Sequence, residues 1–139
     1  MKFWDTSAVI PLLVDESSSS GITEAFIKDP TIIVWWGTSI ECVSALSRLE
    51  REGKLSTKEI EDIIGRLRLL RSAWREVQPA AQVKTTAERV LRLHPLRAQD
   101  AQQLAACIMV AGEHEVEFVT LDERLRTAAL KEGMRAPVF

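Results

Sequence analysis

The chain has few residues of the kinds that make disulfides or zinc sites, with two cysteines and two histidines among 139 residues. Cys42 and Cys107 do not form a CxxC pair, so the sequence predicts neither a disulfide framework nor a zinc site. We expect both cysteines to be small buried hydrophobic residues. His94 and His114 lack metal-ligand spacing, and a place near a helix end explains each of them without a ligand or general-base role.

A charge excess and a long hydrophobic run are also missing. The 18 basic and 20 acidic residues give a net charge of −2, so any contact with nucleic acid must come from local clustering of basic residues. The N-terminal stretch MKFWDTSAVIPLLVDE is too short and too charged for a signal peptide or a membrane span. We therefore expect a cytoplasmic protein without membrane contact.

Length and composition predict one domain that spans residues 1–139. A chain that is 46% hydrophobic and 27% charged can bury a core at this size and has no room for a second domain. Internal repeats and low-complexity tracts are absent from the sequence. The serine run at 17–20 lies too near the N-terminus to link two domains, so we expect a loop and a helix cap there.

Hydrophobic periodicity predicts an α/β fold in which strands alternate with helices. The expected strands are 1–5, 31–36 and 116–120, with a weaker candidate at 137–139. The expected helices are 19–28, 38–52, 57–76, 81–93, 98–111 and 123–131. Strands separated by helices need crossover connections, which predicts a mostly parallel sheet covered on both faces.

Four acidic residues stand where the chain passes from a strand or turn into a helix. They are Asp5, Glu41, Asp100 and Asp122. The carboxyl ends of parallel strands form the crevice where ligands bind in an open α/β sheet. The four acids can therefore converge on one place.

Helix capping is the alternative explanation for each acid taken alone. Residues 38–41 match the capping box S/T-x-x-E, Asp100 and Asp122 are suitable N-caps, and Asp5 can start a turn. Capping does not explain why several acids coincide with strand ends, in particular Asp5 at the end of the first strand.

Converging carboxylates would require a cation, because like charges a few ångströms apart repel each other. Oxygen ligands without paired histidine or cysteine favour Mg²⁺ or Mn²⁺ over Zn²⁺. Such an ion can activate water and neutralise charge on a phosphate. This donor set indicates phosphodiester hydrolysis.

The segment 66–97 is strongly basic, with eight basic and two acidic residues. It can be a track for nucleic acid, a solvated helix face, or a dock for an acidic protein segment. Leu67, Leu70 and Trp74 recur at helical spacing and should face inward. Three arginines then remain as candidates for contact with nucleic acid: Arg68, Arg71 and Arg75.

Four motifs, in order along almost the whole chain, resemble those of PIN-domain ribonucleases, in particular VapC-type toxins of toxin–antitoxin pairs. The motifs are MKFWDTSA, TSIECVSALSRLEREGKLS, LRAQDAQQLA and FVTLDERL. The resemblance implies a three-layer α/β/α sandwich with a five-stranded parallel sheet. It also implies a Mg²⁺-dependent endoribonuclease that cleaves RNA with metal-activated water, forms a homodimer and is silenced by an antitoxin.

The resemblance places the family's four metal ligands at Asp5, Glu41, Asp100 and Asp122. The first three would bind one ion, and Asp122 would help to hold a second ion or position water. Small hydroxyl residues that support such a site would be Ser7 and Thr120.

Other function classes remain as alternatives. A housekeeping PIN-domain nuclease in RNA processing, or a PIN domain that only binds RNA, would keep the same fold. A receiver-type signalling domain also gathers acids at strand ends, but it needs a lysine on the last strand, and residues 135–139 contain none. A phosphatase of the haloacid dehalogenase type needs an acid where Ser7 stands.

Overall fold

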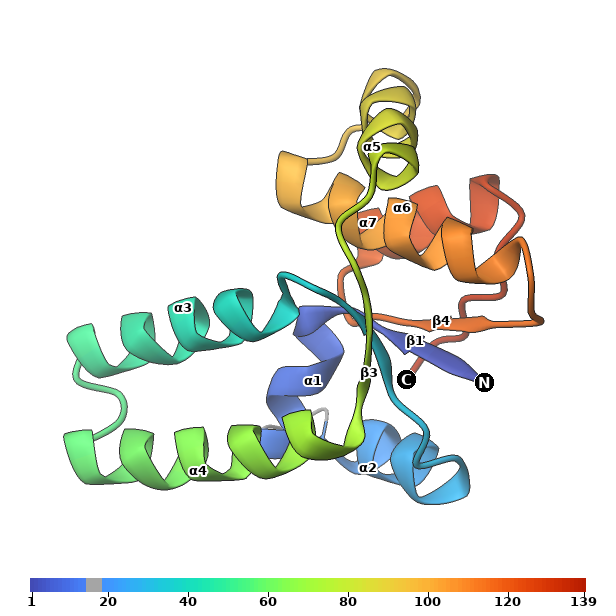
Figure 1. Cartoon of the computed structure of the whole chain (residues 1–139). Coiled ribbons are helices and arrows are strands. Elements are labelled where there is room, and N and C mark those ends of the chain that lie inside the picture. The colour runs from blue at the N-terminus through green and yellow to red at the C-terminus, as the bar shows by residue number, and fades with distance from the viewer. Residues whose placement is uncertain (15–18) are drawn as a thin grey trace.

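The computed structural model, which describes residues 1–14 and 19–139, has a parallel sheet between layers of helices (Figure 1). The strands are β1 (Lys2–Trp4), β2 (Ile33–Trp35), β3 (Arg75–Val77) and β4 (Glu117–Val119). The helices are α1 (Thr6–Leu13), α2 (Ser19–Lys28), α3 (Thr38–Arg51), α4 (Thr57–Ala73), α5 (Ala81–Leu93), α6 (Ala98–Ala111) and α7 (Glu123–Lys131). Residues 17 and 18 of the serine run lie outside the described residues, and residues 19 and 20 begin α2.

The strand order is β3-β2-β1-β4, and all neighbouring strands are parallel. Phe3 of β1 is in register with Ile33 of β2 and with Phe118 of β4. This order differs from the 2-1-3-4-5 order of receiver-type domains, which argues against that alternative. Because all strands run the same way, the residues that follow them gather at one edge of the sheet.

Helices cover both faces of the sheet, as the sequence predicted. In Figure 1, α5, α6 and α7 lie on one side, and α1, α2 and α4 lie on the other. Side chains alternate between these layers along β1: Phe3 packs in the cluster that includes α5, α6 and α7, and Trp4 packs in the cluster of α1 to α4. The rings of Phe3 and Phe118 lie 5.8 Å apart between their centroids.

Helices α3 and α4 form an antiparallel pair that projects to one side of the sheet (Figure 1). Gly53 follows α3 with a φ of 72°, a left-handed conformation that favours glycine. Helix α4 then starts with a capping box, in which Ser56 and Glu59 each accept a hydrogen bond from the other's backbone N–H. This pair carries Glu41 at the sheet end of α3 and two of the arginines expected to contact RNA, Arg68 and Arg71, on α4.

The expected helix 57–76 was wrong at its end, because α4 stops at Ala73 and β3 follows at once. Arg75 donates its backbone N–H to Ile32 O over 2.9 Å, which starts the pairing with β2. Trp74 is buried and continues the apolar spacing of α4 beyond the helix. Hydrophobic periodicity alone therefore could not show that the helix ends at Ala73 and that a strand begins at Arg75.

Helix α1 was not predicted, and the reason lies in its burial. Its eight residues TSAVIPLL include Pro11 and hardly any polar positions, so no amphipathic repeat marks a helix. Residues 8–11 are all buried. The helix begins directly after Asp5, whose carboxylate accepts the Ser7 N–H as an N-cap.

The fifth strand implied by the resemblance is absent from the described residues, so the expected five-stranded sheet is corrected to four strands. Near the C-terminus, Arg135 forms an isolated parallel bridge with Glu117, and the Phe118 N–H donates to Arg135 O over 2.7 Å. Residues 137–139, the weak strand candidate, are not in a strand. Pro137 lacks an N–H, so it cannot donate to a ladder beyond this bridge.

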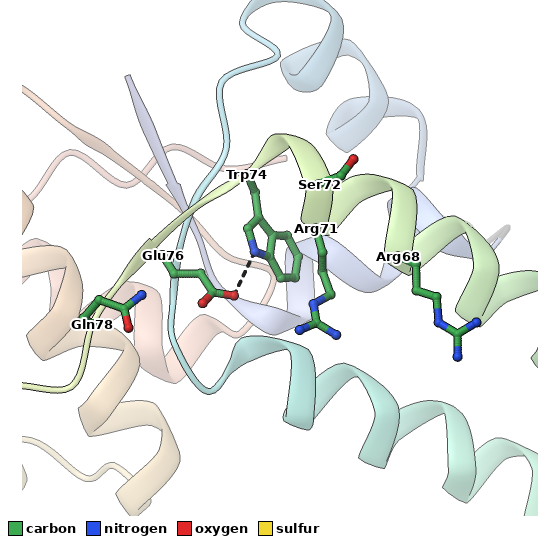
Figure 2. A pocket seen from close by; sticks show the side chains of 6 residues that line it. All are labelled: Arg68, Arg71, Ser72, Trp74, Glu76 and Gln78. Atoms are coloured by element: carbon green, nitrogen blue, oxygen red, sulfur yellow. Dashed lines mark hydrogen bonds between the residues drawn. The ribbon is translucent and has the colours of Figure 1, made fainter.

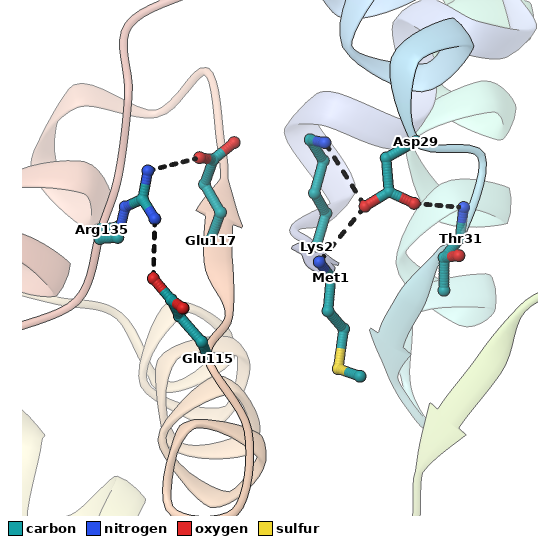
Figure 3. Close-up of polar contacts among 7 residues, drawn as sticks. All are labelled: Met1, Lys2, Asp29, Thr31, Glu115, Glu117 and Arg135. Carbon is teal, nitrogen blue, oxygen red and sulfur yellow. Dashed lines mark hydrogen bonds and ion pairs between the residues drawn. The ribbon is translucent and has the colours of Figure 1, made fainter.

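Ion pairs fix the chain ends near the sheet (Figure 3). The N-terminal ammonium and Lys2 Nζ lie 3.3 and 3.5 Å from Asp29 Oδ2, and Asp29 Oδ1 accepts the Thr31 N–H over 3.1 Å. Arg135 lies 2.9 Å from Glu115 and 3.8 Å from Glu117. Each exposed pair should contribute little, on the order of 0–1 kcal/mol.

The cysteines and His94 have structural roles. Cys42 and Cys107 are buried and free, as predicted, and burial raises the pKa of Cys42 to about 12. His94 ends α5 with its Nε2 3.7 Å from Glu132 Oε2, and Arg89 Nη1 lies 2.7 Å from Glu132 Oε1. Within residues 1–14 and 19–139, no helix combines the length and the apolar character that a membrane span needs.

Candidate active site

The candidate site lies at the carboxyl ends of two neighbouring strands, β1 and the edge strand β4. Trp4 and Val119 are in register, and the Asp5 N–H donates to Val119 O over 3.0 Å. Asp5 and Thr120, the residues that follow these strands, are therefore held side by side by backbone pairing.

Asp5 is buried and its carboxylate is held by hydroxyl groups. Its Oδ2 accepts hydrogen bonds from Ser7 Oγ over 2.6 Å, from Thr120 Oγ1 over 2.9 Å and from the Ser7 N–H over 3.3 Å. Burial raises the pKa of Asp5, the hydrogen bonds lower it, and the negative charge of Asp100 raises it further. The net shift is upward, so a bound cation would relieve a real cost at this position.

Ser7 and Thr120 connect Asp5 to the loop that carries Asp122. Their hydroxyl oxygens lie 3.1 Å apart, the Leu121 N–H donates to Ser7 Oγ over 2.9 Å, and the Asp122 N–H donates to Thr120 Oγ1 over 3.1 Å. Both residues expected to support the site thus contact the carboxylate of Asp5.

Glu41 lies in the first turn of α3, and its Oε2 accepts a hydrogen bond from Gln103 Nε2 over 2.9 Å. Burial raises the pKa of Glu41 to about 7, and the charges of Asp5 and Asp100 add to this rise, while the bond from Gln103 opposes it. Residues 38–41 do not form the expected capping box, because Gly37 is the N-cap and offers no side chain. Helix capping therefore does not account for Glu41.

Asp100 lies in the first turn of α6, where its Oδ2 accepts the Arg97 N–H over 3.2 Å. The N-cap of α6 is Arg97, so the suggestion from the sequence that Asp100 is the N-cap was wrong. The negative charge of Asp100 raises the pKa of both Asp5 and Glu41. Asp5, Glu41 and Asp100 are hereafter called the acid site.

Asp122 is the N-cap of α7, and its Oδ1 accepts the Leu125 N–H over 3.0 Å. Its backbone N–H is bonded to Thr120, so the loop is fixed beside the acid site. The structure thus shows Asp122 in the capping role, one hydrogen bond away from the residues that hold Asp5.

The donor chemistry of the acid site fits Mg²⁺ or Mn²⁺. In the described part of the chain, no three His, Cys, Asp or Glu side chains lie close enough to enclose an ion by themselves. Mg²⁺ does not need such a cage, because it is usually bound by one or two carboxylates and keeps several waters. The buried Asp5 and the half-buried Glu41 have raised pKa values, in part because neighbouring carboxylates repel their negative charge, and this matches that mode.

Sequence reasoning missed Gln103, Thr6 and Thr38, which complete the polar interior of the site. Gln103 Nε2 lies 3.1 Å from Thr6 Oγ1 and 3.0 Å from Thr38 Oγ1, in addition to its contact with Glu41. A glutamine among the apolar residues of α6 was the available signal, because a buried polar side chain needs partners.

The arginines expected to contact RNA are split between two places. Arg68 and Arg71 lie on the same side of α4 as Trp74 in Figure 2, toward α3. They border a hollow of about 510 Å³, hereafter the arginine hollow, lined by Arg68, Arg71, Ser72, Trp74, Glu76 and Gln78. Trp74 Nε1 donates to Glu76 Oε2 over 3.0 Å across it.

Arg75 does not belong to the arginine hollow. It opens β3, so its side chain points to the opposite face from Trp74 and borders a different hollow with Met1 and Ile33. Elsewhere in the basic segment, Arg66 donates to Leu13 O over 3.0 Å. The segment is therefore not one continuous basic surface.

Comparison of the sequence with protein-family models and with curated proteins gave no match. Solved structures do match. FitAcB from Neisseria gonorrhoeae aligns with a TM-score of 0.71 at 14% identity, over 98% of this chain and 96% of that chain. VapBC2 from Rickettsia felis, bound to a promoter DNA fragment, aligns with a TM-score of 0.68 at 13% identity over 99% and 98%.

A third match is VapC20 from Mycobacterium tuberculosis, a toxin that cleaves the sarcin–ricin loop. It has a TM-score of 0.64 and 17% identity, over 92% of this chain and 95% of that chain. At such identities, structural likeness establishes the fold and leaves the activity to be argued from the site. The fold expected from the four sequence motifs is thus confirmed: this chain shares the fold of FitAcB, VapBC2 and VapC20.

Proposed function

We propose that this protein is a metal-dependent endoribonuclease that acts as the toxin of a toxin–antitoxin pair. The observation that carries the proposal is the acid site, in which the buried carboxylate of Asp5 and the half-buried carboxylate of Glu41, both with raised pKa values, lie at the carboxyl edge of the sheet with Asp100. Buried acids of this kind are costly to a fold, and they are typical of functional sites. The fold is that of the toxins named above.

In this proposal Asp5, Glu41 and Asp100 hold Mg²⁺ or Mn²⁺, and Asp122 helps to hold a second ion or to position water. When bound, the ion supplies charge neutralisation at a phosphate and makes water more acidic. The chain itself contributes oriented carboxylates. No cysteine, serine or histidine nucleophile is required.

The hydroxyl groups of Ser7 and Thr120 orient the acid at the centre of the site. Both donate to the same oxygen of Asp5, which leaves Oδ1 of this carboxylate without any of the three hydrogen bonds that hold Oδ2. A carboxylate fixed through one oxygen can present the other to an ion. The backbone N–H groups of residues 121 and 122 hold these hydroxyls in turn.

The arginine hollow is the proposed contact for the RNA backbone. Arg68 and Arg71 are exposed, and neither forms an ion pair among those found in the described residues. Gln78 follows β3 and brings the hollow to the carboxyl edge of the sheet, the edge where the acid site lies. Arginine suits this role because its planar group matches phosphate oxygens.

Replacing Arg68 and Arg71 together with alanine should weaken RNA binding irrespective of sequence. The slope of log affinity against log salt should become shallower by about 0.7–1 for each lost phosphate contact. The measurement is a salt series of RNA-binding isotherms with an Asp5→Asn background to prevent cleavage. Arg51→Ala with Arg92→Ala removes the same charge elsewhere; an equal loss in that control would assign the effect to net charge alone.

The proposed partners are an antitoxin and a second copy of the chain, and the proposed compartment is the cytoplasm, where RNA is available. The support for the antitoxin is that the solved structures of this fold include a toxin–antitoxin complex from Klebsiella pneumoniae. A basic side chain from the antitoxin could take part of the ion's place beside the acids. Co-purification of this chain from its native cells, followed by identification of any bound small protein and an RNase assay of the complex, checks this partner.

Cleavage of RNA in the presence and absence of a chelator tests the proposed activity. Purified protein with Mg²⁺ should cut single-stranded RNA into discrete fragments, and excess EDTA should abolish cutting because the acids alone cannot neutralise a phosphate. Excess Mg²⁺ should restore it. Equal cleavage in EDTA would remove the proposed mechanism, and no cleavage under any of these conditions would remove the activity.

A further inference from the structure

Gln103 is buried at the meeting point of three helices. It lies one turn after Asp100 on α6, and only 1% of it is exposed. Its Nε2 lies 3.1 Å from Thr6 on α1, 3.0 Å from Thr38 on α3 and 2.9 Å from Glu41 on α3. A single amide nitrogen thus joins the first turns of α1 and α3 to α6.

The chemistry of the amide makes Glu41 the partner that matters. An amide nitrogen carries two hydrogens, so it can donate to two of the three oxygens at one time. An ionised carboxylate is a stronger acceptor than a hydroxyl group. Gln103 therefore restrains Glu41 first, and the hydroxyl groups of Thr6 and Thr38 share its remaining hydrogen.

Packing alone does not explain a glutamine here. Its Oε1 is buried and has no hydrogen-bond partner among the described residues, which costs free energy. The neighbours Ala101, Leu104 and Ala105 are fully buried and apolar. An apolar side chain of the same shape would avoid that cost, so the contacts of the N–H groups, and not packing, account for a glutamine at this position.

We propose that Gln103 is a positioning residue that fixes the Glu41 carboxylate toward the ion shared with Asp5 and Asp100. This inference rests on the proposed function. Gln103 is too deeply buried to contact RNA, so it acts only through Glu41. Loss of its N–H groups should weaken metal binding and turnover and should leave RNA binding unchanged.

The test compares Gln103→Met with two other variants. Methionine has nearly the shape of glutamine and no donor, so it removes the contact with little change in volume. Gln103→His restores one N–H near the position of Nε2. Gln102→Met is the matched control, because Gln102 directly precedes Gln103 on α6 and is exposed.

Three quantities are measured for each variant: Mn²⁺ affinity by calorimetry without RNA, kcat and KM for RNA at saturating Mg²⁺, and the thermal unfolding midpoint. Gln103→Met should lower the Mn²⁺ affinity and kcat by about 10–100-fold, the usual range for a residue that orients a metal ligand. KM should not change. Gln103→His should recover most of the loss, and Gln102→Met should match the parent.

A purely structural role predicts another pattern. If Gln103→Met lowers only the unfolding midpoint, with Mn²⁺ affinity and kcat as in the parent, the inference is overturned. If this variant does not fold, Gln103→Asn withdraws the amide by one methylene, and parental Mn²⁺ affinity in that variant overturns the inference equally. If the unsubstituted protein binds Mn²⁺ but does not cleave RNA, the proposed function is contradicted and the calorimetry still decides the role of Gln103. If the unsubstituted protein binds no Mn²⁺, both the proposed function and the role of Gln103 are contradicted.

Discussion

Asp5→Asn should abolish RNA cleavage and leave the fold intact. The loss should exceed the 10–100-fold cost that is typical of residues that only orient a ligand, because Asp5 would contact the ion itself. Asparagine can still accept from Ser7 and Thr120 through its carbonyl oxygen, so the hydrogen bonds that position residue 5 can persist. Burial raises the pKa of Asp5, so removing its charge should not lower stability at pH 8.

The measurement is cleavage rate beside thermal unfolding by circular dichroism. Asp62→Asn is the matched control, since Asp62 is exposed on α4. The capping explanation predicts a different result, because asparagine caps helices about as well as aspartate. Parental activity in Asp5→Asn would mean that Asp5 only caps α1.

Sequence periodicity predicted the layers of this fold well where helices have one polar face and clear ends. Helices α5 and α6 begin and end at the expected residues, and Pro95 and Gly112 mark their ends in the sequence. Sequence periodicity failed where an element is buried on nearly all sides or is too short to show a repeat. Helix α1 is buried on nearly all sides, and β3 has three residues that follow α4 without a glycine or proline.

The sequence predicted only part of the candidate site, because some of its contacts join residues that are far apart in the chain. The rule that strand ends share an edge placed Asp5, Glu41 and Asp100 together, and the charge effects among them agree with this placement. Burial raises the pKa values of Asp5 and Glu41 more than the neighbouring charges do. Gln103 escaped prediction because its importance depends on three side chains from 62 to 97 residues away in sequence.

Metal affinity should fall as the pH is lowered, because Glu41 must lose its proton before it can bind the ion. The pKa of this carboxyl is raised to about 7 by burial first and by the neighbouring charges next, so at pH 6 most Glu41 side chains are protonated. An ion must displace that proton, which weakens binding below pH 7 and gives full affinity above it. Competition by this one proton should make the affinity about tenfold lower at pH 6 than at pH 8.

Calorimetric titration of Mn²⁺ into the metal-free protein tests the central claim most directly, because it asks whether the buried acids form a metal site at all. Titrations at pH 6 and pH 8, in buffers of different ionisation enthalpy, measure both the affinity and the protons released. The acid site predicts binding at pH 8, weaker binding at pH 6 with proton release from Glu41, and loss of binding in Asp5→Asn. Absence of binding, or the same affinity in Asp5→Asn as in the parent, would contradict the account.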